Sequence, residues 1–210
     1  MFTANDLLKL TDAGVEKYKS KFSSDDEFLV SKVIQETDEY AEYFIITNLS
    51  LMKRKKEPQK PLALTRNPAH KYFKHSLDDD GCALFHSYEE LSRLSDEQLK
   101  NEHPKWLKKR DFRWSLMAPF QSDEAVLKYL LGQLGHAITQ HAIDLNVNEK
   151  AIRRPLNYYI SFGFRKNALL PIDYAKIGSK GLREGMKKTG PKPKNLPELA
   201  TRMTEPDDVT

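Results

Sequence analysis

The stretch that decides the fold is ITQHAIDLNVNEKAIRRPLNYYISF, residues 138–162. Apolar residues recur at helical spacing from Ile138 to Leu145, and a second apolar series follows after a short polar break. Ala142 is small enough to let two helices cross closely. Four residues later, Asn146 tolerates the left-handed backbone that a tight turn requires, where glycine is the usual residue. The spacing therefore predicts two helices joined by a short turn, a helix-turn-helix.

The second predicted helix carries a polar face that runs as far as Ser161. Asn148 is a favourable N-cap, and Ile152 is placed to lock this helix onto the first. Side chains of the types on the opposite face reach base edges and phosphates in DNA. An ordinary helical hairpin with a solvated charged face fits the same spacing. The residues expected to contact a major groove are Asn148, Glu149, Lys150, Arg153, Arg154 and Asn157.

Pro155 breaks a local rule inside this second helix. Proline removes a backbone hydrogen bond, and its ring clashes with the carbonyl group of Ala151, at a cost of about 3 kcal/mol in an ordinary helix. We expect the helix either to kink at Pro155 or to end near Arg154 and restart. Both outcomes leave residues 149–154 free to enter a groove.

The composition indicates a soluble protein of one large or two small domains. The 210 residues include a single cysteine, Cys82, so no intrachain disulfide can form. No apolar run approaches the roughly 18 residues that a membrane span needs. The N-terminus is amphipathic and of mixed charge, unlike a signal peptide. We therefore expect a cytoplasmic protein without a membrane partner.

The net charge of +4 conceals an asymmetry along the chain. Residues 1–101 carry a net charge of −3, residues 102–194 carry +10, and the last 16 residues carry −3. A basic block of this size beside a helix-turn-helix is typical of nucleic-acid binding. Charge that only kept the protein soluble would be of mixed sign, as it is in the first of these segments but not from Pro171 to Lys194.

The N-terminal residues 1–26 predict a short helical segment. Asn5 or Thr11 is the expected cap, and Leu7 and Leu8 lie on the expected apolar side. A run of serines and aspartates after this helix breaks the pattern.

Residues 27–103 predict a small β-rich domain with a terminal helix. Apolar runs around a polar turn indicate a β-hairpin, and Ser87 with Glu90 forms a capping box for the helix. Lys53-Arg54-Lys55-Lys56 is expected to be a basic loop tip, either solvated or touching a DNA backbone. The expected strands are residues 28–34, 43–47, 62–64 and 83–85, with residues 49–52 as an extension of the second.

Cysteine and histidine residues in this domain have only a weak resemblance to a zinc-binding pattern. Cys82 and His86 have C-x-x-x-H spacing, with His70 and His75 upstream. Zinc sites usually present two closely spaced pairs of ligands, and histidines five residues apart do not share one helical face. We expect no metal ligands, with the cysteine in a core and the histidines on the surface.

The predicted fold class is α+β, with a small β-rich N-terminal module, an all-α helix-turn-helix domain over residues 104–165 and an extended basic linker. A basic helix over residues 106–117 and a helix capped by Ser122 begin the helical domain. Residues 166–210 are too rich in Gly, Pro and Lys to bury a core. Within them, Gly190–Lys194 has the character of a peptide that lies along a minor groove; a plain disordered linker is the alternative. The residues expected to contact DNA backbone or minor groove are Lys108, Lys109, Arg110, Arg165, Lys166, Lys176, Lys180, Arg183, Lys187, Lys188, Lys192 and Lys194.

The run VNEKAIRRPLNYYISFGFRKNALLP, residues 147–171, resembles the end of the helix-turn-helix in TnsB-type transposases, which belong to the Mu/TnsB branch of DDE transposases. The resemblance covers roughly residues 106–194 and is only architectural over residues 1–101. Two departures from the family pattern are Pro155, in place of an ordinary helix former, and an inserted Ile172. The matching residues are Lys109-Arg110 in the upstream helix, Val147-Asn148, Tyr159, Gly163, Asn167 to Pro171, Tyr174 and Gly178.

The resemblance implies that the chain is the N-terminal portion of a longer bacterial protein, associated with the nucleoid when bound to DNA. It implies sequence-specific binding of double-stranded DNA at the repeated sites of transposon ends, in heteromeric and some CRISPR-associated transposons. It also implies self-association on DNA and contact with other transposition proteins. The segment itself is expected to catalyse nothing and to hold no cofactor. Cleavage and strand transfer would belong to an RNase H-like domain beyond it, with a divalent metal, expected to be Mg²⁺.

Two other functions fit the same sequence. A transcriptional regulator would combine the helix-turn-helix with a β-rich sensor domain and would bind a small ligand. A protein-docking adaptor in a transposition assembly would use the helical domain to bind protein rather than DNA.

Overall fold

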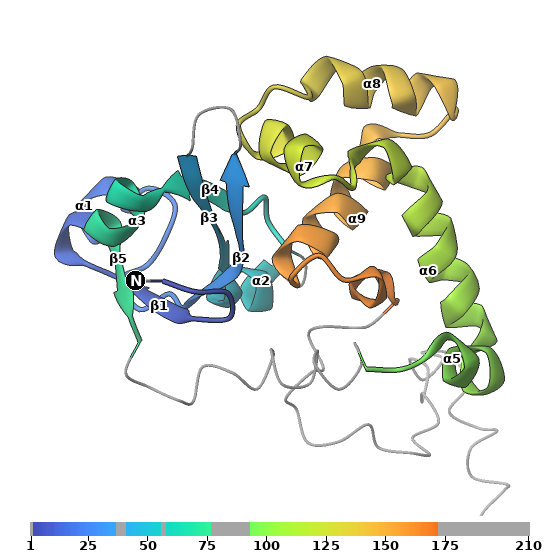
Figure 1. Cartoon of the computed structure of the whole chain (residues 1–210), viewed down its shortest axis with the longest axis horizontal. Helices are drawn as coiled ribbons and strands as arrows, with labels where there is room; N and C mark the ends of the chain where they lie inside the picture. Colours follow the sequence, from blue (N-terminus) through green and yellow to red (C-terminus); the bar gives the residue numbers. More distant parts are fainter. Residues whose placement is uncertain (1, 37–40, 56–57, 77–92, 172–210) are drawn as a thin grey trace, which may run out of the picture. The chain divides into compact units, whose positions relative to one another are not determined.

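The computed structural model describes residues 2–36, 41–55, 58–76 and 93–171, all of which belong to one compact unit. They combine helices with a β-sheet, so the predicted mixed α and β class is confirmed. The strands in the described residues are β1 (Leu7–Leu10), β2 (Phe28–Glu36), β3 (Ala41–Asn48), β4 (Leu62–Thr65) and β5 (Phe73–His75). They form one antiparallel sheet in the order β4-β3-β2-β1-β5 (Figure 1).

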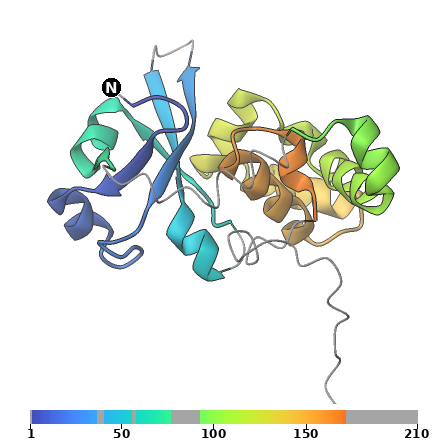
Figure 2. The ribbon, with the colours of Figure 1, turned by 90° about the horizontal axis from the view of Figure 1, so that it is seen from below.

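Helices cover both faces of this sheet. Among the described residues up to Ser76 they are α1 (Asp12–Tyr18), α2 (Leu49–Lys55) and α3 (Arg66–Tyr72). The described residues from Arg93 onward contribute α5 (Asp96–Glu102), α6 (Pro104–Leu116), η2 (Ala118–Phe120), α7 (Asp123–Leu130), α8 (Gly135–Asp144), α9 (Glu149–Ser161) and η3 (Lys166–Leu169). The ribbon views show α1 and α3 on one side of the sheet, and α7 and α9 on the other (Figures 1 and 2).

The segment Leu7–Leu10 is a strand, which corrects the prediction of a helix there. Leu8 and Leu10 are buried while their neighbours are partly exposed, so burial alternates as in a strand. β1 lies between β2 and β5, and pairing with both strands satisfies its backbone. The helix begins only after Thr11, one of the two predicted caps. A short apolar run fits the periodicity of a helix and that of a strand equally well. Sheet partners that are distant in sequence decide which of the two structures forms.

Residues Leu49–Lys55 form α2, which corrects the predictions of a strand extension and of a basic loop tip for this stretch. Asn48 ends β3, and its side-chain carbonyl accepts a hydrogen bond from the backbone N–H of Leu51. Leu49 and Met52, three residues apart on one helical face, are both buried. Lys53, Arg54 and Lys55 therefore belong to the end of a helix.

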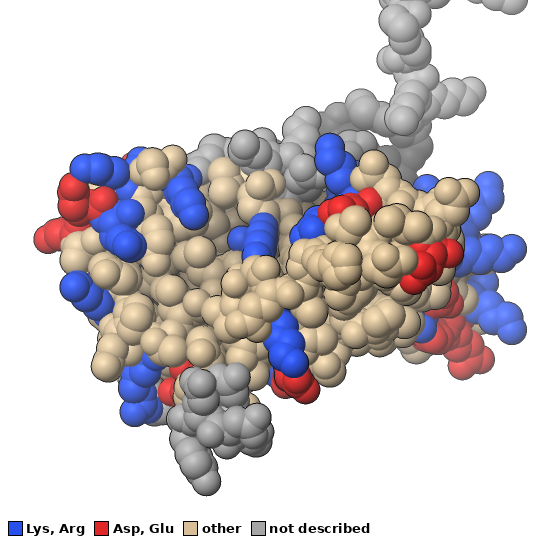
Figure 3. All heavy atoms as spheres, turned by 90° about the horizontal axis from the view of Figure 1, so that it is seen from above, with Lys and Arg blue, Asp and Glu red and all other residues tan. Residues whose placement is uncertain are grey.

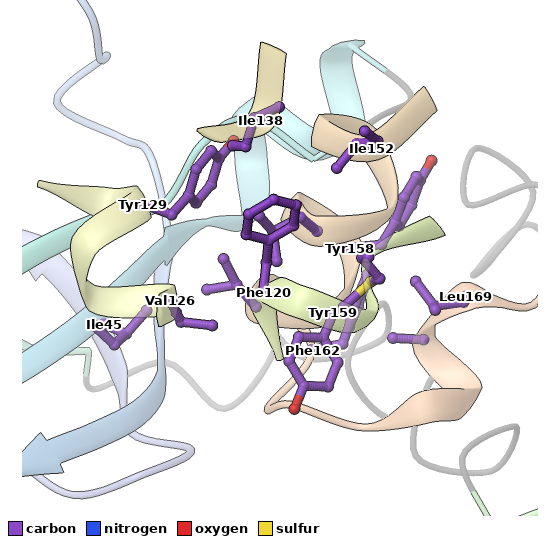
Figure 4. Close-up of a cluster of buried hydrophobic side chains, with 14 of the residues drawn as sticks. Ile45, Phe120, Val126, Tyr129, Ile138, Ile152, Tyr158, Tyr159, Phe162 and Leu169 are labelled. Atoms are coloured by element: carbon purple, nitrogen blue, oxygen red, sulfur yellow. The ribbon is translucent and has the colours of Figure 1, made fainter. Parts of the chain in front are cut away.

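Each face of the sheet has its own apolar core. On one face, Phe28 and Val30 pack with residues of α1 and α3. On the other face, Leu29 and Ile45 pack with residues of α2, η2 and α7 to α9 (Figure 4). Strands that are buried on both faces read as nearly continuous apolar runs, which explains the sequence of β2 and β3. The β-rich and helical parts of the chain share the second of these cores.

A β-bulge in β2 attaches the helices to the sheet. Between Val30 and Lys32 the pairing with β3 shifts register, and the two consecutive residues Ser31 and Lys32 both contact the helical layer. The Ser31 hydroxyl donates a hydrogen bond to the carbonyl oxygen of Ser161 in α9 (3.1 Å). The Lys32 ammonium lies 2.7 Å from the Asp123 carboxylate at the start of α7. In a regular strand two successive side chains point to opposite faces, so the bulge makes this double contact possible.

The helix starts after residue 93 agree with the predicted signals only in part. The Ser122 hydroxyl accepts a hydrogen bond from the N–H of Ala125 and caps α7, as predicted. α6 begins with Pro104, two residues before the predicted start. The terminal helix of the β-rich domain, predicted to start at Ser87, is not helical at residues 93–95, and a capping box at Ser95 starts α5 instead. The capping box predicted at Ser87 and the strand predicted at residues 83–85 lie outside the described residues.

Arg110 on α6 is buried, which corrects the prediction that it contacts a DNA backbone. Its side chain is 1% exposed. The guanidinium donates hydrogen bonds to the carboxylates of Asp96 (2.7 Å) and Asp111 (2.9 Å) and to the side-chain carbonyl of Asn167 (2.6 Å). A guanidinium has five donors in a planar array, and groups from three elements satisfy them here. Arg110 thus joins α5, α6 and the segment that includes η3.

Replacing Arg110 with Met should lower the free energy of unfolding by about 2 to 3 kcal/mol, because several buried hydrogen bonds to charged groups are lost together. Replacing the exposed neighbour Lys109 with Met should change it by less than about 0.5 kcal/mol. Urea denaturation followed by circular dichroism measures both. Equal effects of the two substitutions would contradict the structural role of Arg110.

The same network should make stability depend on pH. The hydrogen bond from Arg110 lowers the pKa of Asp96 below its ordinary value of 3.8. Burial alone would raise the pKa of Asp111, but hydrogen bonds from Lys166 and Arg110 outweigh burial and lower it. Lowered pKa values stabilise the fold above the unfolded-state pKa, and this stabilisation is lost as the pH falls through the folded-state values. The stability difference between the wild type and Arg110→Met should therefore shrink below about pH 4; a constant difference from pH 7 to pH 2.5 would contradict this reasoning.

Candidate functional site

The turn between α8 and α9 has the backbone geometry that the sequence predicted. Asn146 has a φ angle of 50°, in the left-handed region. Its N–H donates to the carbonyl oxygen of Ile143 (2.9 Å), and the N–H of Val147 donates to the carbonyl oxygen of Ala142 (2.9 Å). This pair of bonds is the Schellman pattern, which ends helices at a left-handed residue. Ala142 is 3% exposed and Ile152 is fully buried, so the two helices pack closely.

The first residues of α9 fix the local structure. The Asn148 side chain accepts a hydrogen bond from the N–H of Lys150 (2.9 Å), which confirms it as the N-cap. The Glu149 carboxylate accepts hydrogen bonds from the Thr139 hydroxyl on α8 (2.6 Å) and from Arg153 (3.0 Å). Both bonds lower the pKa of Glu149, and the bond from Thr139 has the larger effect. Asn148 and Glu149 therefore position α9 and orient Arg153.

α9 continues through Pro155 as one helix to Ser161, so the predicted break near Arg154 does not occur. Leu156 and Ile160 are fully buried, and burial of side chains of this size contributes roughly 1.5 to 3 kcal/mol each. That packing offsets the roughly 3 kcal/mol cost of an internal proline. Ser161 is also fully buried, which corrects the extension of the polar face to this residue.

An open hollow of about 390 Å³ lies beside the first turns of α9. Two elements form it: α9 itself and the segment that connects α2 to β4. Four of the six residues predicted to contact a major groove meet in this hollow. The lining residues are Pro58, Gln59, Lys150, Arg153, Arg154 and Asn157.

Positive charge is concentrated around this hollow. Lys150 and Arg154 are exposed to solvent. Lys60 follows the lining residue Gln59, and its ammonium lies 4.9 Å from the centroid of the Tyr129 ring, within the range of a cation–π interaction. Burial, and next the charge of Arg153, lower the pKa of Lys60. An anion bound near these two cations would relieve their repulsion.

Asn157 lies in the same hollow and is oriented by Tyr129. The Tyr129 hydroxyl donates a hydrogen bond to the side-chain carbonyl of Asn157 (2.8 Å). Tyr129 is 4% exposed, and burial raises the pKa of its hydroxyl, so the hydroxyl stays a donor at neutral pH. This bond directs the carbonyl of Asn157 towards Tyr129 and leaves the amide NH₂ as a donor.

The other predicted DNA-contacting residues do not line this hollow. Lys108 and Lys109 are exposed on α6, and Arg165 is exposed after α9. Lys166 is half-buried and pairs with Asp111 (2.9 Å). The remaining seven lie outside the described residues: Lys176, Lys180, Arg183, Lys187, Lys188, Lys192 and Lys194.

Surface charge is of mixed sign. On the face drawn in Figure 3, Lys and Arg occur singly over the middle and gather towards the edges, with Asp and Glu beside them. Of the net charge of +10 over residues 102–194, residues 102–171 carry +5 and residues 172–194 carry +5. Half of the basic excess predicted for DNA binding thus belongs to the part of the chain beyond Pro171.

Pro58, Gln59, Lys60, Tyr129 and Thr139 lie in or beside the site, and none of them was predicted from the sequence. Lys60 and Gln59 end the run KRKKEPQK, residues 53–60, in which the basic character is visible but the contact with α9 is not. Tyr129 and Thr139 are ordinary helix residues in the sequence. Their roles depend on contacts made across 10 and 28 residues, and no local pattern reports such contacts.

In the part of the chain that the structure describes, no group of three or more His, Cys, Asp or Glu side chains is placed to hold a metal ion. Cys82 and His86 lie outside that part, and His70 stacks on Phe2 with 4.3 Å between ring centroids. None of the helices in the described ranges is long and apolar enough to cross a membrane. No protein-family model and no curated protein matches the chain.

Replacing Asn146 with Ala should lower the free energy of unfolding by about 1 kcal/mol, because Ala lacks the short polar side chain whose local hydrogen bonding lets Asn tolerate this φ angle. Replacing it with Gly should change stability by no more than about 0.5 kcal/mol. Gln140, exposed in the middle of α8, is the matched control. There Gly should be worse than Ala by about 0.5 to 1 kcal/mol. Thermal or urea denaturation of the four variants checks that Gly is preferred to Ala at position 146 and Ala to Gly at position 140. The same residue preferred at both positions would contradict the left-handed turn.

Proposed function

We propose that this chain binds double-stranded DNA, and that α8, the turn and α9 act as a helix-turn-helix. In such motifs the second helix enters the major groove while the first crosses the backbone. The turn at Asn146 and the burial of Ala142 and Ile152 support the proposal, because they hold α9 in one orientation on α8. A recognition helix has to be held in this way if its side chains are to meet base edges in register.

The observation that carries the proposal is the meeting of four side chains in one hollow, namely Lys150, Arg153, Arg154 and Asn157. Arginine and lysine donate to phosphates and to guanine, and asparagine pairs with adenine in the major groove. Glu149 already orients one of the arginines, and Tyr129 orients the asparagine. Side chains that are ordered before binding lose less conformational entropy on binding.

The exposed part of α9 sets the reach of the interface. Residues 149–157 span about 12 Å at 1.5 Å per residue, which corresponds to about four base pairs at a rise of 3.4 Å. Beyond Asn157, α9 is buried from Tyr158 to Ser161. One such helix reads a short site, so a specific complex requires repeated sites or further contacts along the DNA.

We place the DNA site at transposon ends, because residues 147–171 resemble the corresponding part of TnsB-type transposases. Under this proposal the chain recognises repeated end sequences and catalyses nothing itself. A metal-dependent RNase H-like domain of the parent protein would cleave and join the strands. The basic residues from Lys176 to Lys194 would follow the minor groove between the two. Self-association and other transposition proteins would act on the bound DNA.

The test begins with selection of a binding site from a library of randomised 30-base-pair duplexes. The double substitution Lys150→Ala and Arg154→Ala should weaken binding to the selected site by a factor of about 10 to 100, the effect of losing base-reading contacts. Binding to a shuffled duplex of the same composition should weaken less, because the specific base contacts are absent there and only phosphate contacts can be lost. Fluorescence anisotropy at fixed ionic strength gives both dissociation constants.

The matched control removes two exposed lysines from the opposite end of the chain, by Lys17→Ala and Lys21→Ala. This control lowers the net charge by the same amount and should change binding less than twofold. Two outcomes would count against the proposal. Equal losses in both double variants would reduce the interaction to net charge, and failure of the wild type to select any duplex would favour the protein-docking function.

A further inference from the structure

Pro58 and Gln59, between α2 and β4, form one wall of the hollow whose other wall is α9, and Lys60 follows them directly in the chain. Pro58 is buried and Gln59 is partly exposed. Lys60 is anchored by its position over the Tyr129 ring, and Tyr129 in turn bonds to Asn157 on the α9 wall. The β-rich part of the chain therefore reaches the same site as the predicted recognition helix.

The charges on the two walls are unequally neutralised. Arg153 has a carboxylate partner in Glu149, at 2.9 Å. For Lys60 and Lys150, the described residues supply no carboxylate within ion-pair distance. The lowered pKa of Lys60 follows from burial and the repulsion by Arg153. Positive charge of this kind, in a concave site open to solvent, attracts an anion with several acceptor oxygens.

The Gln59 amide adds a neutral donor to this wall. An amide NH₂ and two ammonium groups match the non-bridging oxygens of a phosphate, which accepts several hydrogen bonds at once. The hollow, at about 390 Å³, is larger than one phosphate group and open on one side. It therefore accepts a phosphate that belongs to a strand and leaves room for the sugars on either side.

We propose that Pro58–Lys60 is a second DNA-contacting element, and that Gln59, Lys60 and Lys150 together hold one phosphate of the DNA backbone in the hollow beside α9. This inference rests on the proposed DNA binding and deepens it. The phosphate clamp fixes the register of α9 in the groove, because a backbone phosphate held from two sides cannot slide along the helix. The β-rich module thereby takes part in recognition directly.

The test uses the full chain and the duplex that it selects, with a neutral methylphosphonate placed at one backbone position at a time. For the wild type, one position beside the α9 site should lower affinity about tenfold. In Lys60→Met, which keeps the aliphatic stem over Tyr129, affinity for the unmodified duplex should fall, and methylphosphonate at that position should cost less than twofold. The slope of log K against log salt should also decrease by about one. Lys17→Met, the control, should keep the full tenfold effect.

The clamp would be overturned if each methylphosphonate lowered the affinity of the wild type and of Lys60→Met by the same factor. If Lys60→Met unfolds, Gln59→Leu gives the same comparison, with a smaller expected loss. The outcomes separate the two proposals. If the wild type selects no duplex, the proposed function is wrong. If it selects a duplex and the double substitution Lys150→Ala and Arg154→Ala weakens binding, but Lys60→Met changes the effect of no single methylphosphonate, only the clamp is wrong.

Discussion

The contact between the β2 bulge and the helical layer is the constraint on which the arrangement of the site depends. Ser31 and Lys32 are adjacent in sequence, yet they bind α9 and α7 respectively, through Ser161 and Asp123. The ion pair is partly exposed, and such pairs contribute only about 0 to 1 kcal/mol. The ion pair therefore fixes the position of the helices on the sheet, whereas the apolar core behind it supplies most of the stability. With the end of α9 held on the sheet, only its first turns remain at the surface.

That placement explains how α9 can carry a proline and still serve as a rigid support. Buried side chains on both sides of Pro155 determine where the helix lies, so the missing hydrogen bond does not free its N-terminal part. The N-cap at Asn148 and the bond from Thr139 to Glu149 hold the other end. The proposed reading residues are therefore attached to a helix that is restrained at both ends. Under the DNA-binding proposal, this preorganisation favours specificity over adaptability.

Local signals in the sequence predicted the helix starts at Ser122 and Asn148 and the left-handed turn at Asn146, and they gave Thr11 as one of two candidate caps, because capping and turn geometry depend on neighbours within a few residues. The failures share a different cause. Leu7–Leu10 is a strand because β2 and β5 lie on either side of it, and Arg110 is buried because Asp96 and Asn167 reach it from other elements. Charge alone does not distinguish an arginine that binds DNA from one that satisfies an internal network. The position of Gln59 opposite α9 in the hollow likewise results from tertiary contacts that no local sequence pattern reports.

The distribution of charge separates two contributions to the proposed binding. Residues 172–194 carry a net charge of +5, and phosphate contacts from such a segment add affinity that depends on salt and carries little sequence information. The hollow contributes fewer contacts, but its side chains are oriented by Glu149 and Tyr129, and one wall comes from a different part of the chain. A short reading helix gains specificity when a second element fixes its register, because a shift by one base pair then breaks contacts on both walls. Under the proposals, discrimination between sites thus arises in the folded unit, and the basic segment adds to the affinity for whichever site that unit selects.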